Sequence, residues 1–213
     1  DQNQLTGQIP PEVGNLANLR FLRLDQNQLT GQIPPEMGKL ANLQYLYLEY
    51  NELTGQIPPE MGNLTKLRYL RVDSNQLVGD IPSSFLNLTQ LVDSELFLSY
   101  NGFSAFDPAM IAFLELKSPG WQLTQTVPPS DVTAQVVGSG KAKVSWTPIL
   151  FNYYAGYYEV GMSQTPGGPY QFLPANRTAG KSASSLVLAG LSCGQYYMVV
   201  RTVTLPHAMN QSA

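Results

Sequence analysis

Residues Leu19–Gln90 read as three consecutive copies of one unit: LRFLRLDQNQLTGQIPPEMGKLAN, LQYLYLEYNELTGQIPPEMGNLTK and LRYLRVDSNQLVGDIPSSFLNLTQ. Asn3, Asn27, Asn51 and Asn75 recur at a constant interval of 24 residues. A fixed period of this length is typical of repeat proteins, in which each copy folds into one structural unit. The sequence therefore predicts an array of similar coils stacked on one another.

Each copy begins with the pattern LxxLxLxxNxL, which alternates as a short strand does. One coil cannot bury its own leucines, so they must point into a core shared with the neighbouring coils. The asparagine amide both donates and accepts hydrogen bonds, which suits it to closing the turn after the strand. We interpret the following residues as a structural asparagine ladder: Asn3, Asn27, Asn51, Asn75 and Asn101.

The second half of the unit, LTGxIPPExG, resembles the plant-type subfamily of leucine-rich repeat proteins, and the resemblance covers every full copy. It implies that the Thr-Gly-x-Ile-Pro segment adds a second short strand beside the first. It also implies that the residues between the leucines point outward on a concave sheet. Glu12, Glu36 and Glu60 recur in this half, and we interpret them as a repeated scaffold position because Ser84 replaces them in the fourth copy.

The outward positions of the expected concave sheet form columns of aromatic, basic and acidic side chains. The first column is Phe21, Tyr45, Tyr69 and then Glu95, the second is Arg23, Tyr47, Arg71 and Phe97, and the acids Asp25, Glu49 and Asp73 flank them. Adjacent strands lie about 4.8 Å apart, so these side chains are expected to stack. Tyrosine and arginine are enriched where interfaces carry most of their binding energy, which predicts a partner-binding face.

Two other interpretations of these columns stay open at the level of sequence. The rings would stabilise the sheet through cross-strand pairs, and arginine beside tyrosine would form a self-satisfied cation–π contact, without any ligand. Aromatic platforms also stack on sugar rings. The sequence thus leaves three functions: recognition of a protein or peptide, recognition of a glycan as an accessory part of a larger surface or hydrolytic protein, and a structural spacer.

The repeat changes after Gln90. Asn101 follows Asn75 by 26 residues, and the two extra residues predict a bulge around Asp93–Glu95. Residues 102–122 then have the pattern of a helical cap, with Asp107 as N-cap and proline in the first turn. At the other end the chain starts inside a repeat, so we expect either further repeats or self-association there. These features define a first domain, 1–126.

The rest of the chain, 127–213, has strand patterns about ten residues apart and predicts a β-sandwich. It resembles a fibronectin type III domain, in which Trp146 would be the core tryptophan, Tyr158–Val160 the third strand and Tyr197 the corner tyrosine. The seventh strand of that family would fall at Asn210–Ala213, so we expect a truncated sandwich. An unpaired edge invites self-association.

Composition excludes several other functions. The 213-residue chain has a net charge of −3 and no basic stripe, which argues against nucleic-acid binding. It also has no apolar run long enough for membrane insertion. Cys193 has no second cysteine to pair with, and we interpret it as a buried or semi-buried small hydrophobe. His207 is the single histidine, so a zinc site or a histidine-based catalytic triad has no parts. We expect no cofactor, no metal and no enzymatic activity.

Together these observations predict a mostly β chain with short helical segments: a leucine-rich repeat solenoid followed by a fibronectin type III-like sandwich. The plant receptors that carry this repeat usually have paired cysteines in their caps and no such sandwich, as the resemblance implies. We therefore expect a secreted or cell-surface recognition protein of bacterial origin that binds a protein or peptide through its concave face.

Overall fold

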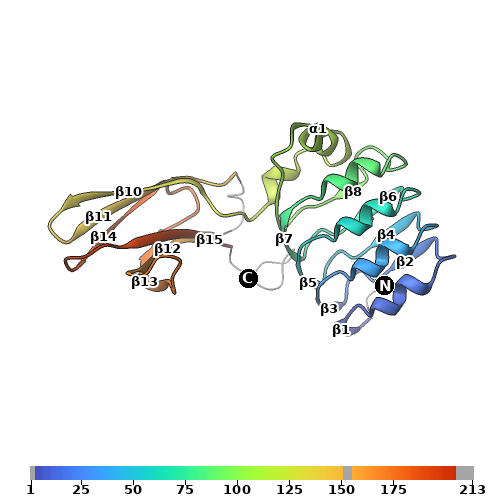
Figure 1. Cartoon of the computed structure of the whole chain (residues 1–213), viewed down its shortest axis with the longest axis horizontal. Coiled ribbons are helices and arrows are strands. Elements are labelled where there is room, and N and C mark those ends of the chain that lie inside the picture. The colour runs from blue at the N-terminus through green and yellow to red at the C-terminus, as the bar shows by residue number, and fades with distance from the viewer. Residues whose placement is uncertain (1–2, 151–154, 205–213) are drawn as a thin grey trace. The chain divides into compact units, whose positions relative to one another are not determined.

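The computed structural model describes residues 3–150 and 155–204 (Figure 1). The described chain forms two compact units, and the division between them falls between Gln125 and Thr126. Each unit has its own buried apolar cluster. We therefore describe each unit by itself.

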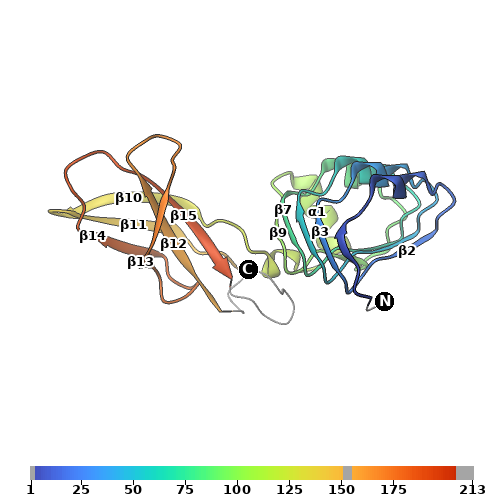
Figure 2. The same ribbon diagram turned by 90° about the horizontal axis from the view of Figure 1, so that it is seen from below.

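The first unit contains the two parallel sheets that the repeat predicts. The strands within the LxxLxL motif form a four-stranded sheet of β2 (Phe21–Arg23), β4 (Tyr45–Tyr47), β6 (Tyr69–Arg71) and β8 (Leu96–Phe97). The Thr-Gly segments form a five-stranded sheet of β1 (Thr6–Gln8), β3 (Gln28–Gly31), β5 (Glu52–Gly55), β7 (Gln76–Asp80) and β9 (Gly102–Ser104). The coils lie one behind the next, with β3, β7 and β9 on one side and β2 on another (Figure 2).

Short 3-10 helices connect the two sheets where the sequence reads PPExG or its equivalent. They are η1 (Pro11–Asn15), η2 (Pro35–Lys39), η3 (Pro59–Asn63) and η4 (Ser83–Asn87). Gly38 at the end of such a turn shows why the motif requires glycine: a Cβ there would lie 2.4 Å from the backbone oxygen of Glu60 in the next coil. The recurring glutamates therefore supply backbone that the glycine of the preceding coil packs against.

The core of the first unit is built from the leucines of each copy. Leu43, Leu46 and Leu48 are fully buried, as are Leu67 and Leu70 one coil later. Met37 and Met61, which precede the glycine of the 3-10 turns, are also fully buried. The apolar pattern that the sequence assigns to a shared core is thus confirmed.

The end of the first unit is closed by helix α1 (Pro108–Lys117) and the 3-10 helix η5 (Trp121–Thr124). Asp107 is the N-cap, as predicted: its Oδ1 accepts hydrogen bonds from the backbone of Ala109 at 2.7 Å and of Met110 at 3.2 Å. Met110, Leu114 and Trp121 are buried against the leucine core. Residues 102–104 of the expected cap belong instead to β9, so the helical part of the cap starts at Pro108.

The two-residue insertion forms a turn at Asp93 and Ser94, directly before β8, at the place where the sequence predicts a bulge. The backbone N–H of Glu95 donates to the oxygen of Val92, and Ser94 has a positive φ of 62°. Lys117 of the cap helix donates from Nζ to Asp93 at 2.6 Å and to the backbone oxygen of Leu91 at 2.6 Å. The inserted residues therefore connect the last coil to the cap helix through a hydrogen bond between Asp93 and Lys117.

The second unit contains two antiparallel sheets of three strands each. One is ordered β10 (Ser130–Gly138), β11 (Lys141–Thr147), β14 (Ser185–Ala189), and the other β13 (Gln171–Arg177), β12 (Gly156–Ser163), β15 (Tyr197–Thr204). Both sheets contribute to one buried cluster, which contains Val144, Trp146, Tyr158, Val160, Leu188 and Val200. The expected alternation of buried and exposed residues along β11 is confirmed.

Two details of the second unit depart from the sequence analysis or lie beyond it. Cys193 is exposed, because it lies in the connection between β14 and β15 rather than in a strand, so its interpretation as a buried or semi-buried hydrophobe is wrong. Tyr197 opens β15 and is half-buried. His207 and the expected last strand at Asn210–Ala213 lie outside the described residues.

Candidate binding face

The outward side of the four-stranded sheet carries the side chains that the sequence assigns to the concave face. Along each strand these side chains alternate with leucines such as Leu46 and Leu70, which are buried on the opposite side. We call this surface the ladder face and define it by ten residues: Phe21, Arg23, Asp25, Tyr45, Tyr47, Glu49, Tyr69, Arg71, Asp73 and Phe97.

The first column of the ladder face is a continuous stack of aromatic rings. Phe21 pairs in register with Tyr45, and Tyr45 with Tyr69. The ring centroids lie 4.3 Å and 4.8 Å apart, and the rings are tilted by only 5° and 11°. The rings therefore cover one another's faces along the stack. Phe21, at the end of the stack, is 59% exposed.

The expected fourth member of this column, Glu95, adds no ring to the stack. Its backbone oxygen accepts a hydrogen bond from the N–H of Leu70 at 3.1 Å, which places it beside β6. Its side chain is half-buried. The aromatic stack thus spans three coils.

The second column alternates cations and rings. The guanidinium of Arg23 lies 5.1 Å from the ring centroid of Tyr47, and that of Arg71 lies 5.9 Å from the same ring. Arg71 also lies 4.2 Å from the ring centroid of Phe97. Each contact is within the range of a cation–π attraction. Burial raises the pKa of the Tyr47 hydroxyl, so this phenol stays neutral and remains available as a hydrogen-bond donor.

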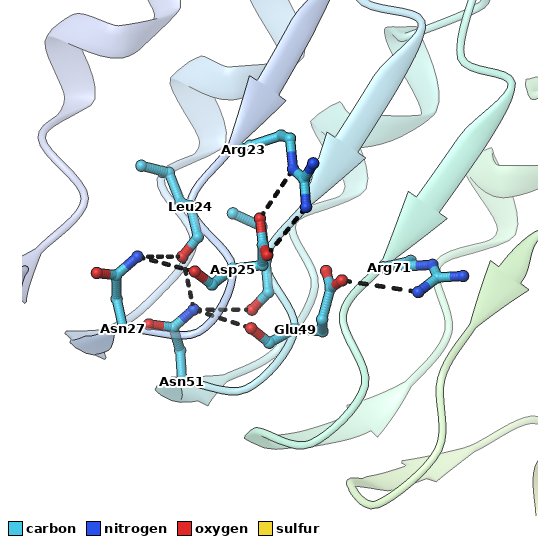
Figure 3. A network of polar contacts seen from close by, with 8 residues as sticks. Arg23, Leu24, Asp25, Asn27, Glu49, Asn51 and Arg71 are labelled. Atoms are coloured by element: carbon cyan, nitrogen blue, oxygen red, sulfur yellow. Dashed lines mark hydrogen bonds and ion pairs between the residues drawn. The ribbon is translucent and has the colours of Figure 1, made fainter. Parts of the chain in front are cut away.

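The third column contains the acids, and two of them are more enclosed than the flanking surface charges expected from the sequence. Asp25 is 1% exposed and Glu49 is 5% exposed. Arg23 holds Asp25 with two hydrogen bonds, Nε to Oδ1 at 3.2 Å and Nη2 to Oδ2 at 3.3 Å (Figure 3). Glu49 has a single, long ion pair, 3.8 Å from Oε1 to Nη1 of Arg71.

The enclosure of the third column changes the ionisation of its acids. Burial raises the pKa of Glu49 to about 7; the negative charges of Asp73 and Asp25 add to the shift, while its own backbone N–H and Arg71 oppose it. Burial likewise raises the pKa of Asp73 to about 6. Among the described residues, Oε2 of Glu49 and Oδ1 of Asp73 are buried without a hydrogen-bond partner. The pKa values of these two acids of the ladder face therefore lie closer to neutral pH than those of ordinary carboxyl groups.

Asparagines fix the backbone on both sides of the acids. Nδ2 of Asn51 donates to the backbone oxygens of Leu48, in its own coil, and Leu24, in the preceding coil, at 3.1 Å and 2.9 Å (Figure 3). Its Oδ1 accepts from the backbone N–H of Leu29 at 3.0 Å. Asn75 and Asn101 repeat this pattern. The third column is thus held on a rigid series of turns.

The hydrogen-bonded series of side-chain amides differs from the predicted ladder at both ends. Asn3 is exposed and borders a shallow polar hollow at the first coil. At the other end the series continues to Gln125, whose Oε1 accepts from the N–H of Phe103 at 3.0 Å and whose Nε2 donates to the oxygen of Leu98 at 3.0 Å. Gln125 follows Asn101 by 24 residues, so the repeat interval was the signal that could have identified it.

Within residues 3–150 and 155–204, no group of three or more histidine, cysteine, aspartate or glutamate side chains is placed to hold a metal ion. In these residues, also, no helix is both long enough and apolar enough to span a membrane.

Comparison with known protein families finds a match within the first unit. Residues 2–103 match the family model described as a leucine-rich repeat region. This match covers all the strands of the ladder face and stops before the cap helix. No curated protein matches the chain.

Solved structures that resemble the chain include those of three plant receptors. They are the plant peptide hormone receptor RGFR1 in complex with RGF2 (43% identity, TM-score 0.45), the ectodomain of the Arabidopsis thaliana receptor kinase GASSHO1/SCHENGEN3 in complex with CASPARIAN STRIP INTEGRITY FACTOR 2 (40%, 0.45), and the ectodomain of the A. thaliana receptor kinase SOBIR1 (37%, 0.46). The matches cover 48%, 47% and 52% of this chain. They cover 16%, 12% and 58% of the respective receptor chains.

Proposed function

We propose that the leucine-rich repeat region is a non-catalytic recognition module that binds a protein or peptide segment along the ladder face. The observation that carries the proposal is the exposure of this face. The side chains of Arg23 and Arg71 are 53% and 40% exposed, and Phe21 is 59% exposed, on the opposite side of the sheet from the leucine core. Exposed rings and guanidinium groups on a rigid sheet are the composition of binding hot spots.

The geometry of the aromatic stack favours a protein or peptide over a glycan. A sugar binds an aromatic platform by lying on a ring face. The rings of Phe21, Tyr45 and Tyr69 instead cover one another's faces, so they offer edges and tyrosine hydroxyls to a ligand. A peptide segment can use such edges and hydroxyls through apolar contacts and hydrogen bonds. A glycan is therefore the second choice for the partner.

The same stacking also supports the spacer interpretation, because pairs of this kind stabilise a sheet by themselves. Cross-strand aromatic pairs contribute about 0.2–1 kcal/mol each. A recognition face and a structural spacer predict different results for the same double variant. Replacing Tyr45 and Tyr69 with alanine removes binding if the face recognises a partner, and lowers only stability if the stack is purely structural.

The experiment uses random dodecapeptides displayed on phage and selected on the immobilised full chain. The test variant is Tyr45→Ala, Tyr69→Ala, Arg71→Ala, and the matched control is Phe106→Ala, which removes an 80% exposed ring away from the ladder face. We expect selected peptides to bind the unmodified chain and the control equally and to lose more than about tenfold in affinity for the test variant. Equal affinity for a folded test variant would refute the proposal.

We further infer that the second unit is a fibronectin type III-like spacer and that the chain works at a cell surface or after secretion. The paired antiparallel sheets of the second unit and the buried Trp146 support the first inference. The second rests on the plant-type repeat motif, and the combination of repeat and sandwich is the reason to propose a bacterial source.

A further inference from the structure

The second coil of the ladder face has an acid without an arginine of its own. Coils one and three place Arg23 beside Asp25 and Arg71 beside Asp73, whereas the second coil places Tyr47 beside Glu49. Arg23 is committed to Asp25 by two hydrogen bonds. Arg71 is therefore the arginine that would have to neutralise the charges of both Glu49 and Asp73.

Arg71 does not satisfy either of these two acids. Its contact with Glu49, at 3.8 Å, is longer than a hydrogen bond. Oε2 of Glu49 and Oδ1 of Asp73 have no partner among the described residues, although Glu49 is only 5% exposed. A buried carboxylate oxygen without a partner is unfavourable, and native proteins usually leave such an atom only where another group completes the site.

The charges around these two oxygens define what can complete the site. The titratable and charged groups of the second and third columns are the cations Arg23 and Arg71, the acids Asp25, Glu49 and Asp73, and the neutral phenol of Tyr47. When all three acids are ionised, three negative charges face two positive ones, so one negative charge remains. Two carboxylates are too few oxygen ligands for a divalent metal ion held by the protein alone.

We propose that Glu49 and Asp73 form a subsite of the ladder face that receives one cationic side chain, a lysine or an arginine, of the bound protein or peptide segment. This inference rests on the proposed function. A guanidinium or ammonium group at hydrogen-bond distance replaces the long contact with Arg71, whose 40% exposed side chain keeps its contacts with the rings of Phe97 and Tyr47. The incoming charge also cancels the remaining negative charge of the site.

The subsite makes binding dependent on pH. The two acids must be ionised to hold a cation, yet burial raises the pKa of Glu49 to about 7 and that of Asp73 to about 6 in the free chain. Binding therefore releases protons, and acid opposes it. We expect a selected basic peptide to bind at least about tenfold more weakly at about pH 5.5 than at about pH 8.

The experiment measures the affinity of selected dodecapeptides for the full chain and two variants. The test variant is Glu49→Gln, Asp73→Asn, which keeps shape and removes charge. The matched control is Glu60→Gln, which neutralises an exposed glutamate on η3. Each peptide is also made with its lysine or arginine replaced by glutamine, and circular dichroism checks that every variant is folded.

We expect one basic residue in the selected peptides to contribute about tenfold or more in affinity to the unmodified chain and to the control, and less than about twofold to the test variant. The test variant should also lose the pH dependence. An equal contribution of the basic residue in all three proteins, or selected peptides without any basic residue, would overturn the inference while leaving the proposed function intact. Failure of the unmodified chain to select any peptide would overturn both.

Discussion

Asn51 shows how one side chain joins two coils of the repeat region. It is 9% exposed, accepts from the N–H of Leu29 and donates to the oxygens of Leu24 and Leu48. The residue before it, Tyr50, has a positive φ of 54°, a conformation that is unfavourable for a bulky side chain. The asparagine thus stabilises a strained corner and satisfies the backbone of two neighbouring turns at once.

The first prediction follows from these bonds. Replacing Asn51 with alanine leaves the buried N–H of Leu29 without a partner, whereas the oxygens of Leu24 and Leu48 keep the hydrogen bonds from Asn27 and Asn75. This change should lower the free energy of unfolding by about 1–3 kcal/mol. Chemical denaturation measures this change. Asn63→Ala, at an exposed position of η3, is the control and should change stability by less than about 0.5 kcal/mol. A loss at Asn51 no greater than at Asn63 would contradict the structural role of the amide series.

The second prediction concerns the pH dependence of stability. The pKa of Glu49 is raised to about 7 in the folded chain, whereas an unperturbed glutamate has 4.5. The folded chain therefore binds more protons than the unfolded chain between these values, so the free energy of unfolding falls as pH rises from 4.5 to about 7. Glu49→Gln removes the contribution of Glu49 to this dependence, while that of Asp73 stays, and it should stabilise the chain at about pH 8 by on the order of 2 kcal/mol.

Denaturation of Glu49→Gln and of the exposed control Glu60→Gln at several pH values tests this prediction. The control should follow the unmodified chain across the whole range, because its carboxyl is exposed. A Glu49→Gln variant that is less stable than the unmodified chain at about pH 8 would show that the carboxylate is well satisfied in the folded state.

Among the elements of the first unit, the repeat motif determines where strands and turns lie. The first half of the motif alternates as a strand does, and the second half contains the proline and glycine residues of the turns. Alternation in LxxLxL predicts the strands and the outward columns, and both are observed. The burial of Asp25 and Glu49 was not predictable in the same way, because it depends on the adjacent coil and the turn that follows. Gln125 was missed because a longer side chain replaces asparagine within the cap.

The third prediction tests the packing of the 3-10 turns. A Cβ at Gly38 would lie 2.4 Å from the backbone oxygen of Glu60, so Gly38→Ala forces adjacent coils apart. We expect a loss of about 1–3 kcal/mol in the free energy of unfolding of the first unit. Gly180→Ala, where no atom lies within 4 Å of the added Cβ, is the control. A Gly38→Ala variant as stable as the unmodified chain would show that the coils can separate without cost.

At the scale of the whole molecule, the chain contains two units with separate buried clusters, and each unit contains one tryptophan. Trp121 belongs to the leucine core, and Trp146 belongs to the cluster between the two antiparallel sheets. Fluorescence of variants that retain a single tryptophan therefore reports on one unit at a time. The protein is well suited to separating a change in the recognition unit from a change in the sandwich unit.

The fourth prediction uses this separation. Asn51→Ala should move the unfolding transition reported by Trp121 to lower denaturant concentration, because Asn51 and Trp121 belong to the same unit. The transition reported by Trp146 should stay within about 0.5 kcal/mol of its original free energy. Denaturation of Trp146→Phe and Trp121→Phe backgrounds, each with and without Asn51→Ala, measures both. An equal shift of the two transitions would show that the units unfold as one.

Hydrogen–deuterium exchange of the full chain, with and without a selected dodecapeptide, tests whether a ligand occupies the ladder face. We expect saturating peptide to slow exchange in the segments that form the ladder face, 21–25, 45–49 and 69–73, while exchange in the five-stranded sheet and in β10 to β15 stays unchanged. Slowed exchange confined to the second unit or to the five-stranded sheet would contradict it.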